Sequence, residues 1–372
     1  MPRPVKKILV FRLGAMGDIL FTTPALRGLN AKYPGCHLTY LTLKQWRFLL
    51  KGNPNVDRVV GLSYCDPRAL GSLARESFDL LLNFLEGEKA AQTCQAIPAR
   101  ERLGNQWRDD TIQPDASGFL FSHDKEARQR QLREGLSYAA LYCRIAGVQA
   151  DSLRFEYHPG RLAEWRARRF LAGWDLARRS PPIALHLHSR GSTSRSWAPE
   201  RALEVVRAFP KQPFLILGYE PDRPQTRLFE TEPNARVSYH VAPVQAGLLR
   251  HCALFVGIDS GPRNLASAMG PPAICLSGPY RPPSSRRFRG TSSSHAGNPA
   301  LPASRRPARL AATAWTGFLS NPLCRPLGGD WKPYRPEFQM LPNTKCRDDL
   351  SPLSRTVLGL ESPAQIGYDG LR

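Results

Sequence analysis

The first group of residues suited to chemistry is Gly14, Gly17 and Asp18, directly after the apolar run 7–11. A helix is predicted to begin here, and helix starts attract phosphate and other anions. Asp18 has two interpretations. It is a carboxylate that caps the helix, or it is a general base for an acceptor hydroxyl, with its charge stabilised by helix amides. The turn lacks the three glycines of a dinucleotide site and the Gly-Lys-Ser/Thr of a P-loop, so its spacing does not choose between them.

A second turn of this kind lies in the other half of the chain. Asp259, Ser260 and Gly261 follow an apolar run and precede a helix predicted over 262–269. The Ser260 and Gly261 amides are suited to bind a diphosphate, and Asp259 is suited to accept hydrogen bonds from sugar hydroxyls. An ordinary Asp-Ser-Gly turn with a helix cap is the structural alternative.

Arg195 is the candidate cation for such a diphosphate. It belongs to a polar loop over 189–196, and a guanidinium pairs well with phosphate oxygens. In so basic a chain, a solvated surface arginine is the structural alternative.

Short apolar strands alternate with helical segments along both halves of the chain, which is typical of α/β proteins with parallel sheets. Strands are predicted over 7–11, 37–41, 58–61, 78–84, 183–187, 214–218, 237–240, 253–257 and 273–276. Helices are predicted over 19–33, 125–146, 162–177, 199–209, 244–250 and 262–269. A Pro-containing linker near 178–182 divides the pattern, so we expect one domain over 1–177 and a second over 183–345.

The sequence changes character after residue 280. Ser, Arg, Pro and Ala dominate 281–325, where neither the strand period nor the helix period can be followed. Regular sequence returns near Cys346, and a capped C-terminal helix with a tail is predicted over 346–372.

The composition describes a globular protein with a basic surface. A length of 372 residues suits about two domains, and a hydrophobic fraction of 42% excludes a disordered chain. Lys and Arg number 52 against 31 Asp and Glu, a formal charge of +21. Such an excess suits nucleotides, phosphorylated glycolipids, an anionic membrane face or nucleic acid. Compositional drift towards Arg is the alternative. No nucleic-acid motif is present, so nucleic acid is not an expected partner.

The sequence predicts a cytoplasmic protein with reduced thiols. No apolar run approaches the length of a membrane span, and the basic start is not followed by a signal-peptide core. The eight cysteines contain no Cys-x-x-Cys pair, which favours free thiols over a metal site or a disulfide set.

Several segments, in the same order along the chain, resemble the lipopolysaccharide heptosyltransferases of glycosyltransferase family 9. The segments are 7–27, with Gly14 to Asp18 at its centre, 78–86, 195–200, 256–262 and 346–352. The resemblance spans most of residues 5–280 and a patch near the end. Several ordered motifs are much more specific than any one of them.

The resemblance implies a GT-B fold, with two Rossmann-like domains whose parallel sheets face each other across a cleft. It implies that the first domain, with the loop of Gly14 and Gly17, holds the acceptor and that the second holds the sugar nucleotide. The implied activity is transfer of heptose from ADP-heptose to the inner core of lipopolysaccharide, with inversion. The implied location is the cytoplasm, at the inner face of the anionic cytoplasmic membrane, with a phosphorylated lipid A-core glycolipid as acceptor.

The resemblance also assigns roles to residues. Asp18 corresponds to the catalytic base, while Arg195 and the Ser260 and Gly261 amides stabilise the leaving diphosphate without a metal or other cofactor. Glu220 or Asp222 holds the nucleotide ribose.

The chain departs from the family pattern at three places. The family has Lys at the position of Arg195 and His at the position of Asn264, and an asparagine hydrogen-bonds but carries no proton. The segment 281–325 matches nothing in the family, and is either a divergent insertion or a stretch read out of frame. These departures leave a second hypothesis open: a catalytically impaired relative that binds a nucleotide sugar or glycolipid without turnover.

Overall fold

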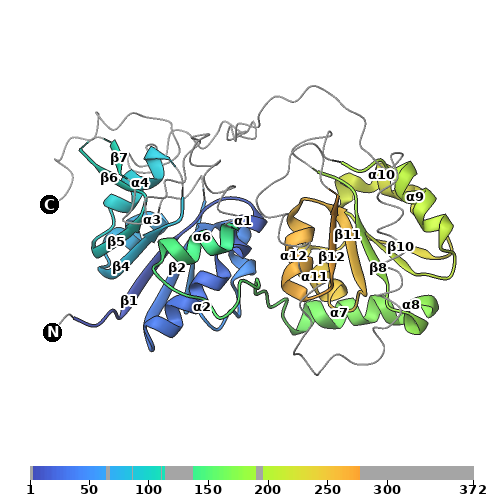
Figure 1. Cartoon of the computed structure of the whole chain (residues 1–372), viewed down its shortest axis with the longest axis horizontal. Coiled ribbons are helices and arrows are strands. Elements are labelled where there is room, and N and C mark those ends of the chain that lie inside the picture. The colour runs from blue at the N-terminus through green and yellow to red at the C-terminus, as the bar shows by residue number, and fades with distance from the viewer. Residues whose placement is uncertain are drawn as a thin grey trace. The chain divides into compact units, whose positions relative to one another are not determined.

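The computed structural model describes residues 3–63, 68–85, 87–109, 111–113, 137–189 and 196–276. These residues form two compact units that divide between Leu153 and Arg154. Each unit contains a five-stranded parallel sheet with helices on both faces (Figure 1). The predicted α/β class with two domains is confirmed. The segments predicted over 281–325 and 346–372 lie outside the described residues.

The N-terminal domain is built on a sheet of strand order β3-β2-β1-β4-β5. Its elements are β1 (Lys7–Phe11), α1 (Met16–Leu20), α2 (Thr23–Lys32), β2 (His37–Leu43), the 3-10 helix η1 (Lys44–Leu49), β3 (Arg58–Leu62), α3 (Arg68–Ala74), β4 (Phe78–Asn83), α4 (Glu88–Gln95), β5 (Ala99–Gly104), the hairpin β6 (Gln106–Arg108) and β7 (Thr111–Gln113), and α6 (Tyr138–Ile145).

The C-terminal domain repeats this topology with the order β10-β9-β8-β11-β12. Its elements are α7 (Arg161–Ala172), α8 (Asp175–Arg179), β8 (Ile183–His186), α9 (Pro199–Ala208), β9 (Phe214–Leu217), η3 (Glu220–Asp222), α10 (Arg223–Thr226), η4 (Arg227–Phe229), β10 (Ala235–Ser238), α11 (Ala242–Leu249), β11 (Leu254–Ile258), α12 (Gly261–Met269) and β12 (Ala273–Leu276).

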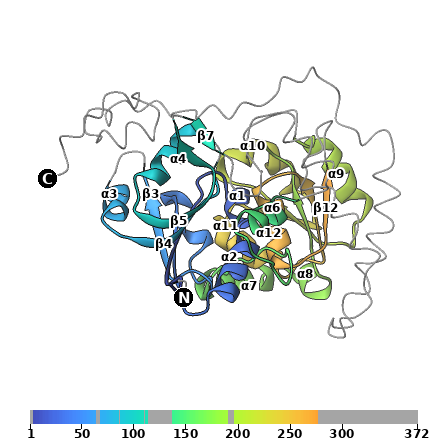
Figure 2. The same cartoon turned by 60° about the vertical axis from the view of Figure 1, so that its left-hand side comes forward.

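The central strands are almost continuously apolar because both of their faces are covered. Leu9 and Phe11 of β1 pack with side chains of α3 and α4, and α2 and α6 lie on the opposite face of the sheet (Figures 1 and 2). In the second domain α9 covers one face, where Leu185 and Val256 are buried. Helices α11 and α12 cover the other face (Figure 1).

The strand predictions are confirmed at each place, with ends shifted by a few residues. The helix expected over 19–33 is instead two helices, α1 and α2. Pro24 lies in the first turn of α2, where it cannot donate a backbone hydrogen bond, so the chain restarts a helix there. Strand β5 was not predicted because its sequence is charged and follows no period of two, and its pairing to β4 makes it a strand.

The division between the domains falls earlier than the predicted 177–183. Helix α7 packs against α11 of the C-terminal domain, and a side chain at Gly247 would come within 2.9 Å of the Ala167 Cβ. The helical spacing of α7 was visible in the sequence, but the helix against which its buried face packs, α11, was not.

None of the helices in the described ranges is long and apolar enough to cross a membrane.

Gly104 ends β5 with a φ of +86°, and a Cβ at this position would overlap the Asn83 carbonyl oxygen. We therefore expect Gly104→Ala to lower the free energy of unfolding of this domain by about 2 kcal/mol or more, because both the backbone conformation and the space require glycine. Urea unfolding followed by circular dichroism measures the change. Gly71→Ala, in α3 with nothing within 4 Å of the added Cβ, is the matched control and should stabilise by about 0.5–1 kcal/mol. Equal effects of the two changes would contradict the expectation.

Candidate functional site

The candidate residues that the structure describes lie at the carboxyl edge of a sheet, and Asp18 and Asp259 follow strands that flank the point where the strand order reverses. In the N-terminal domain this point is between β1 and β4, where Phe11 pairs with Asn83. In the C-terminal domain it is between β8 and β11, where His186 pairs with Gly257. Open parallel sheets bind ligands at such switch points, because the connections on either side leave a crevice there.

In the N-terminal domain, Asp18 is held by two contacts. Its Oδ1 lies 3.2 Å from Nη2 of Arg12, and its Oδ2 accepts a hydrogen bond of 2.8 Å from the Ala15 backbone N–H. The Asp18 side chain stays 33% exposed. Each carboxylate oxygen accepts more than one hydrogen bond, so the exposed part of Asp18 is able to accept a hydroxyl proton from a bound molecule.

Arg12 is the partner of Asp18 that the sequence analysis missed. It follows β1 directly and is buried, and its guanidinium lies 5.8 Å from the centre of the Tyr142 ring. Helix α1 has only five residues, so its dipole is small and the Arg12 charge is the main positive group beside Asp18. An arginine directly after a strand that precedes the Asp18 turn was the available signal.

Position 14 requires glycine because the Asp18 side chain lies against it. Its φ is +132°, and a Cβ there would come within 2.6 Å of Asp18 Oδ2. Gly17 is buried in the first turn of α1. The two glycines predicted as an acceptor-side loop thus allow the Asp18 carboxylate to fold back over the turn.

In the C-terminal domain, the second predicted group surrounds the start of α12. Ser260 is the N-cap residue, but its Oγ lies 3.1 Å from Nδ1 of His186 at the end of β8. Gly261 is the first residue of the helix, and Asn264 donates its backbone N–H to Ser260 O. Helix N-termini leave N–H groups without intrahelical partners and attract anions.

A buried ion pair fixes Asp259 at the same place. Arg263 is the largest fully buried side chain of the described residues, and its Nη2 lies 2.9 Å from Asp259 Oδ1. The Arg263 side chain is 1% exposed and the Asp259 side chain 26%. Sequence reasoning missed Arg263, although an acid and a base four residues apart at a helix start were the signal.

Two buried amide oxygens near this edge have no hydrogen-bond partner among the described residues. They are Oδ1 of Asn264 and Oε1 of Gln245, and the Gln245 amide donates 2.7 Å to Gly218 O at the end of β9. A buried acceptor without a partner costs free energy, so each oxygen is suited to accept a hydrogen bond from a bound molecule.

The two alternatives for a ribose-binding acid differ in their surroundings. Asp222 is buried, and its Oδ2 accepts 2.9 Å from the Tyr219 backbone N–H, so the turn uses this carboxylate. Glu220 is exposed and pairs with Arg223 at 3.1 Å, an interaction that raises the pKa of Arg223. Between the two, Glu220 has the carboxylate that a ligand reaches without breaking the turn.

His188 follows β8 at the same edge. Burial lowers its pKa from the usual value, and the negative charge of Asp222 opposes this shift. Burial thus favours the neutral imidazole of His188, whose ring is able to donate or accept a hydrogen bond.

Arg195 lies outside the described residues, so its predicted role as the cation of the site stays a prediction. Among the residues that the structure describes, no three His, Cys, Asp or Glu side chains gather in a group that could hold a metal ion.

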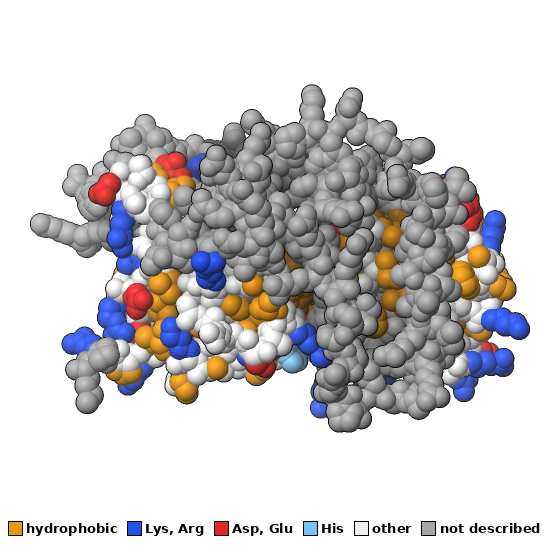
Figure 3. Space-filling model, in the orientation of Figure 1, with side chains coloured by type: hydrophobic (Ala, Val, Ile, Leu, Met, Phe, Trp, Pro, Cys, Tyr) orange, Lys and Arg blue, Asp and Glu red, His pale blue; other side chains and the backbone are white. Residues whose placement is uncertain are grey.

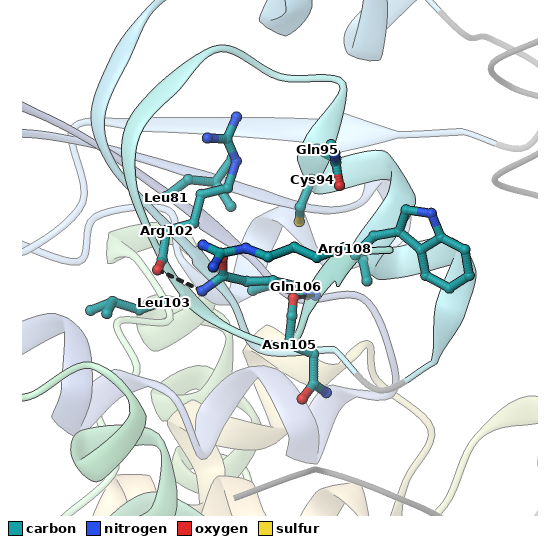
Figure 4. A pocket seen from close by; sticks show the side chains of 11 residues that line it. Leu81, Cys94, Gln95, Arg102, Leu103, Asn105, Gln106 and Arg108 are labelled. Carbon is teal, nitrogen blue, oxygen red and sulfur yellow. Dashed lines mark hydrogen bonds between the residues drawn. The ribbon is translucent and has the colours of Figure 1, made fainter. Parts of the chain in front are cut away.

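A pocket of about 280 Å³ opens in the N-terminal domain beside α4, β5 and β6 (Figure 4). Gln106 donates 3.0 Å to Arg102 O, and Arg108 donates 2.7 Å to Gln106 Oε1. Arg102 donates to two backbone carbonyls, so it is a structural residue. Burial raises the pKa of the Cys94 thiol far above its usual value, which leaves Cys94 unreactive. None of the predicted site residues lines this pocket.

The basic excess of the chain is visible on the described surface. Lys and Arg side chains are spread over both domains rather than collected in one patch on the face that Figure 3 shows. This agrees with the dispersed distribution of Arg along the sequence.

Asp259→Asn is expected to lower the free energy of unfolding of the C-terminal domain by about 3 kcal/mol, because it removes the carboxylate charge that faces the buried Arg263 guanidinium at 2.9 Å. Thermal or urea unfolding measures the loss. Asp175→Asn, which breaks an exposed pair with Arg178, should change stability by less than about 1 kcal/mol. A similar small effect at both positions would show that the buried pair does not stabilise this domain.

Comparisons with known proteins give the context of these two sites. No family model matches the sequence. The chain is 22% identical over 286 residues to Lipopolysaccharide heptosyltransferase 3 of Escherichia coli, which covers 70% of this chain and 80% of that protein.

Solved structures with the same fold include two transferases. The glycosyl transferase family 9 structure from Veillonella parvula DSM 2008 has a TM-score of 0.63 at 20% identity, and covers 76% of this chain and 84% of that one. The E. coli heptosyltransferase WaaC with ADP-2-deoxy-2-fluoro heptose has a TM-score of 0.54 at 17% identity, and covers 74% and 90%. The two sheets therefore form a GT-B fold, and the chain resembles the glycosyltransferase family 9 heptosyltransferases in both sequence and structure.

Proposed function

We propose that this protein is an inverting glycosyltransferase that moves heptose from ADP-heptose to the inner core of lipopolysaccharide. The observation that carries the proposal is the pairing of a partly exposed carboxylate with a buried arginine at the switch point of each domain. The similarity to heptosyltransferases of E. coli supports the choice of donor and acceptor.

In the proposed step, Asp18 acts as a general base towards one hydroxyl of the acceptor. The acceptor oxygen forms a bond to the anomeric carbon from the face opposite ADP, and the bond between that carbon and the β-phosphate oxygen breaks. The hydroxyl proton goes to Asp18, and the electron pair leaves with ADP. Arg12 keeps the Asp18 carboxylate in one orientation, at 3.2 Å, so that its exposed side meets the acceptor.

The start of α12 is proposed to bind the departing diphosphate. Backbone amides at Ser260 and Gly261 and the positive end of the nine-residue helix stabilise negative charge. Asp259 is proposed to accept hydrogen bonds from sugar hydroxyls, and the buried Arg263 keeps its carboxylate in place. Arg195 is proposed as a further cation and Glu220 as the ribose partner. The proposed step includes no metal ion.

The proposed acceptor is a phosphorylated glycolipid, which gives the basic surface a partner of opposite charge. Such an acceptor lies in the inner leaflet of a bacterial cytoplasmic membrane. A cytoplasmic protein that binds this membrane from the inside is therefore the proposed location.

A second candidate is a relative that binds the nucleotide sugar or glycolipid without turnover. The observation that favours it is Asn264, which stands where the family has a protonatable histidine and whose buried Oδ1 has no partner among the described residues. Binding and turnover measured on the same protein distinguish the two candidates.

Asp18→Asn is expected to lower acceptor-dependent ADP release at least about 100-fold, because an amide does not accept the hydroxyl proton. The assay uses purified protein, ADP-heptose and a truncated inner-core acceptor. Asp57→Asn is the matched control, since the Asp57 carboxylate also accepts a backbone N–H, from Leu38 at 2.7 Å. Equal ADP release by the Asp18 and Asp57 variants would contradict the role of Asp18 as general base. Tight ADP-heptose binding without turnover in the unchanged protein would favour the second candidate.

The substitution Asn264→Leu tests whether the side-chain amide of Asn264 binds the donor substrate or only supports the fold. If Asn264 Oδ1 accepts a hydrogen bond from the donor substrate, the change should weaken ADP-heptose binding about tenfold, as calorimetry would show. Thermal stability should stay unchanged or rise, because a buried acceptor without a partner is removed. Unchanged affinity would remove Asn264 from the donor site.

A further inference from the structure

Helix α7 of the C-terminal domain presents two large apolar side chains to solvent. Leu162 is 61% exposed and Trp165 is 53% exposed, and residues three apart are neighbours on one face of a helix. Val241 is the third large apolar side chain that is exposed in the described part of the chain. It follows His240, whose ring contacts Phe170 of α7. The exposed apolar residues are thus on or beside one helix.

Arginines surround the exposed apolar pair, which consists of Leu162 and Trp165. A helix turns by about 100° per residue, which puts Arg161 on one side of the pair and Arg166 on the other. The guanidinium of Arg169 lies over the Trp165 ring, 5.4 Å from its centre. Each of these three arginines is exposed. The outer face of α7 is therefore both apolar and positively charged.

Within the described part of the chain, the acid of α7 itself does not neutralise this face. The helix contains one acid, Glu164, and its carboxylate already contacts Arg250 of the α11 end at 2.7 Å and Arg168 at 4.0 Å. The outer face of α7 therefore has a net positive charge.

The opposite face of α7 holds the helix firmly in the domain. Ala163 and Ala167 are buried, and the helix approaches Gly247 of α11 closely, since a Cβ there would lie 2.9 Å from Ala167 Cβ. The packing of this helix therefore does not depend on Leu162 or Trp165. Their exposure is a feature of the surface rather than of the core.

We propose that the outer face of α7 docks the protein onto an anionic lipid bilayer. A helix with Trp and Leu between arginines is of the type that lies in the plane of a membrane interface, where Trp resides at headgroup level and arginines bind anionic lipid. Nucleic acid fits less well, because Arg169 already covers a face of the Trp165 ring and the aliphatic Leu162 adds nothing to phosphate binding. The inference deepens the proposed function, since it places the transferase beside a glycolipid acceptor.

Co-sedimentation of the full-length protein with vesicles tests this docking. Vesicles of phosphatidylcholine with 30% phosphatidylglycerol, about one anionic lipid in three, are compared with pure phosphatidylcholine vesicles at low and high salt. We expect binding to the anionic vesicles that falls at high salt. Leu162→Ser with Trp165→Ser should lower the partition coefficient about tenfold. Arg161→Ala with Arg166→Ala should lower it roughly 25-fold, at about fivefold for each arginine.

The matched control changes two exposed arginines of α9. This helix covers the face of the C-terminal sheet that lies opposite α11 and α12. Arg201→Ala with Arg207→Ala should leave vesicle binding within about twofold of the unchanged protein. Hydrogen exchange should show protection of 161–172 by anionic vesicles only. Equal vesicle binding by the α7 and α9 variants, or no binding of the unchanged protein, would overturn the proposal. Binding of single-stranded DNA that the α7 variants alone lose, with vesicle binding unchanged, would also overturn it in favour of nucleic acid.

Failure of the docking and failure of the proposed function are distinguishable. Asp18→Asn should bind anionic vesicles like the unchanged protein. The α7 variants should release ADP normally with a deacylated, soluble acceptor, because α7 contributes no residue to the proposed transfer. Loss of vesicle binding with normal ADP release would support the docking surface. Vesicle binding that is unchanged in the α7 variants would contradict it, whatever the transfer rate.

Discussion

A buried arginine behind a partly exposed carboxylate is the interaction on which both candidate sites depend. Arg12 holds Asp18 at the end of β1, and Arg263 holds Asp259 at the start of α12. Removing a guanidinium from water is costly, and an adjacent carboxylate offsets the cost only when the geometry is good. Each pair therefore fixes its carboxylate at the point where the strand order of the sheet reverses, which is where parallel α/β sheets bind ligands.

The proposed roles of the two ion pairs differ because their surroundings differ. Asp18 lies in the first turn of a very short helix, so its position is set by one backbone N–H and one guanidinium, and its exposed side suits proton transfer. Asp259 precedes a nine-residue helix whose first turn contributes amides to the same place. That helix start suits the negative charge of a leaving diphosphate. In the proposed reaction, the same kind of ion pair thus supports a base in one domain and an anion site in the other.

The charge of the protein acts at two length scales. At the sheet edges, individual arginines are buried and matched to single carboxylates, where they orient groups. Over the whole chain, the excess of Lys and Arg gives a formal charge of +21 and a long-range attraction for acidic molecules. The outer face of α7 combines this attraction with exposed Leu162 and Trp165, so it has the two components that an anionic bilayer binds.

Local sequence pattern was sufficient to predict the α/β class, the positions of the central strands and the two turns that carry Asp18 and Asp259. An apolar run bounded by a glycine turn has few alternative structures, so the local pattern was enough to predict a buried strand followed by a turn. The residues that contact those turns could be identified only from the three-dimensional fold. Arg12 and Arg263 were invisible as partners because a surface arginine and a buried one look alike in a basic sequence. The contact of His186 with Ser260 joins residues that are 74 positions apart, and the assignment of α7 to the second domain depends on its packing against α11. Whether a side chain is buried, and which partner it meets, depends on how distant segments pack around each sheet. The spacing of residues along the chain does not show these long-range contacts.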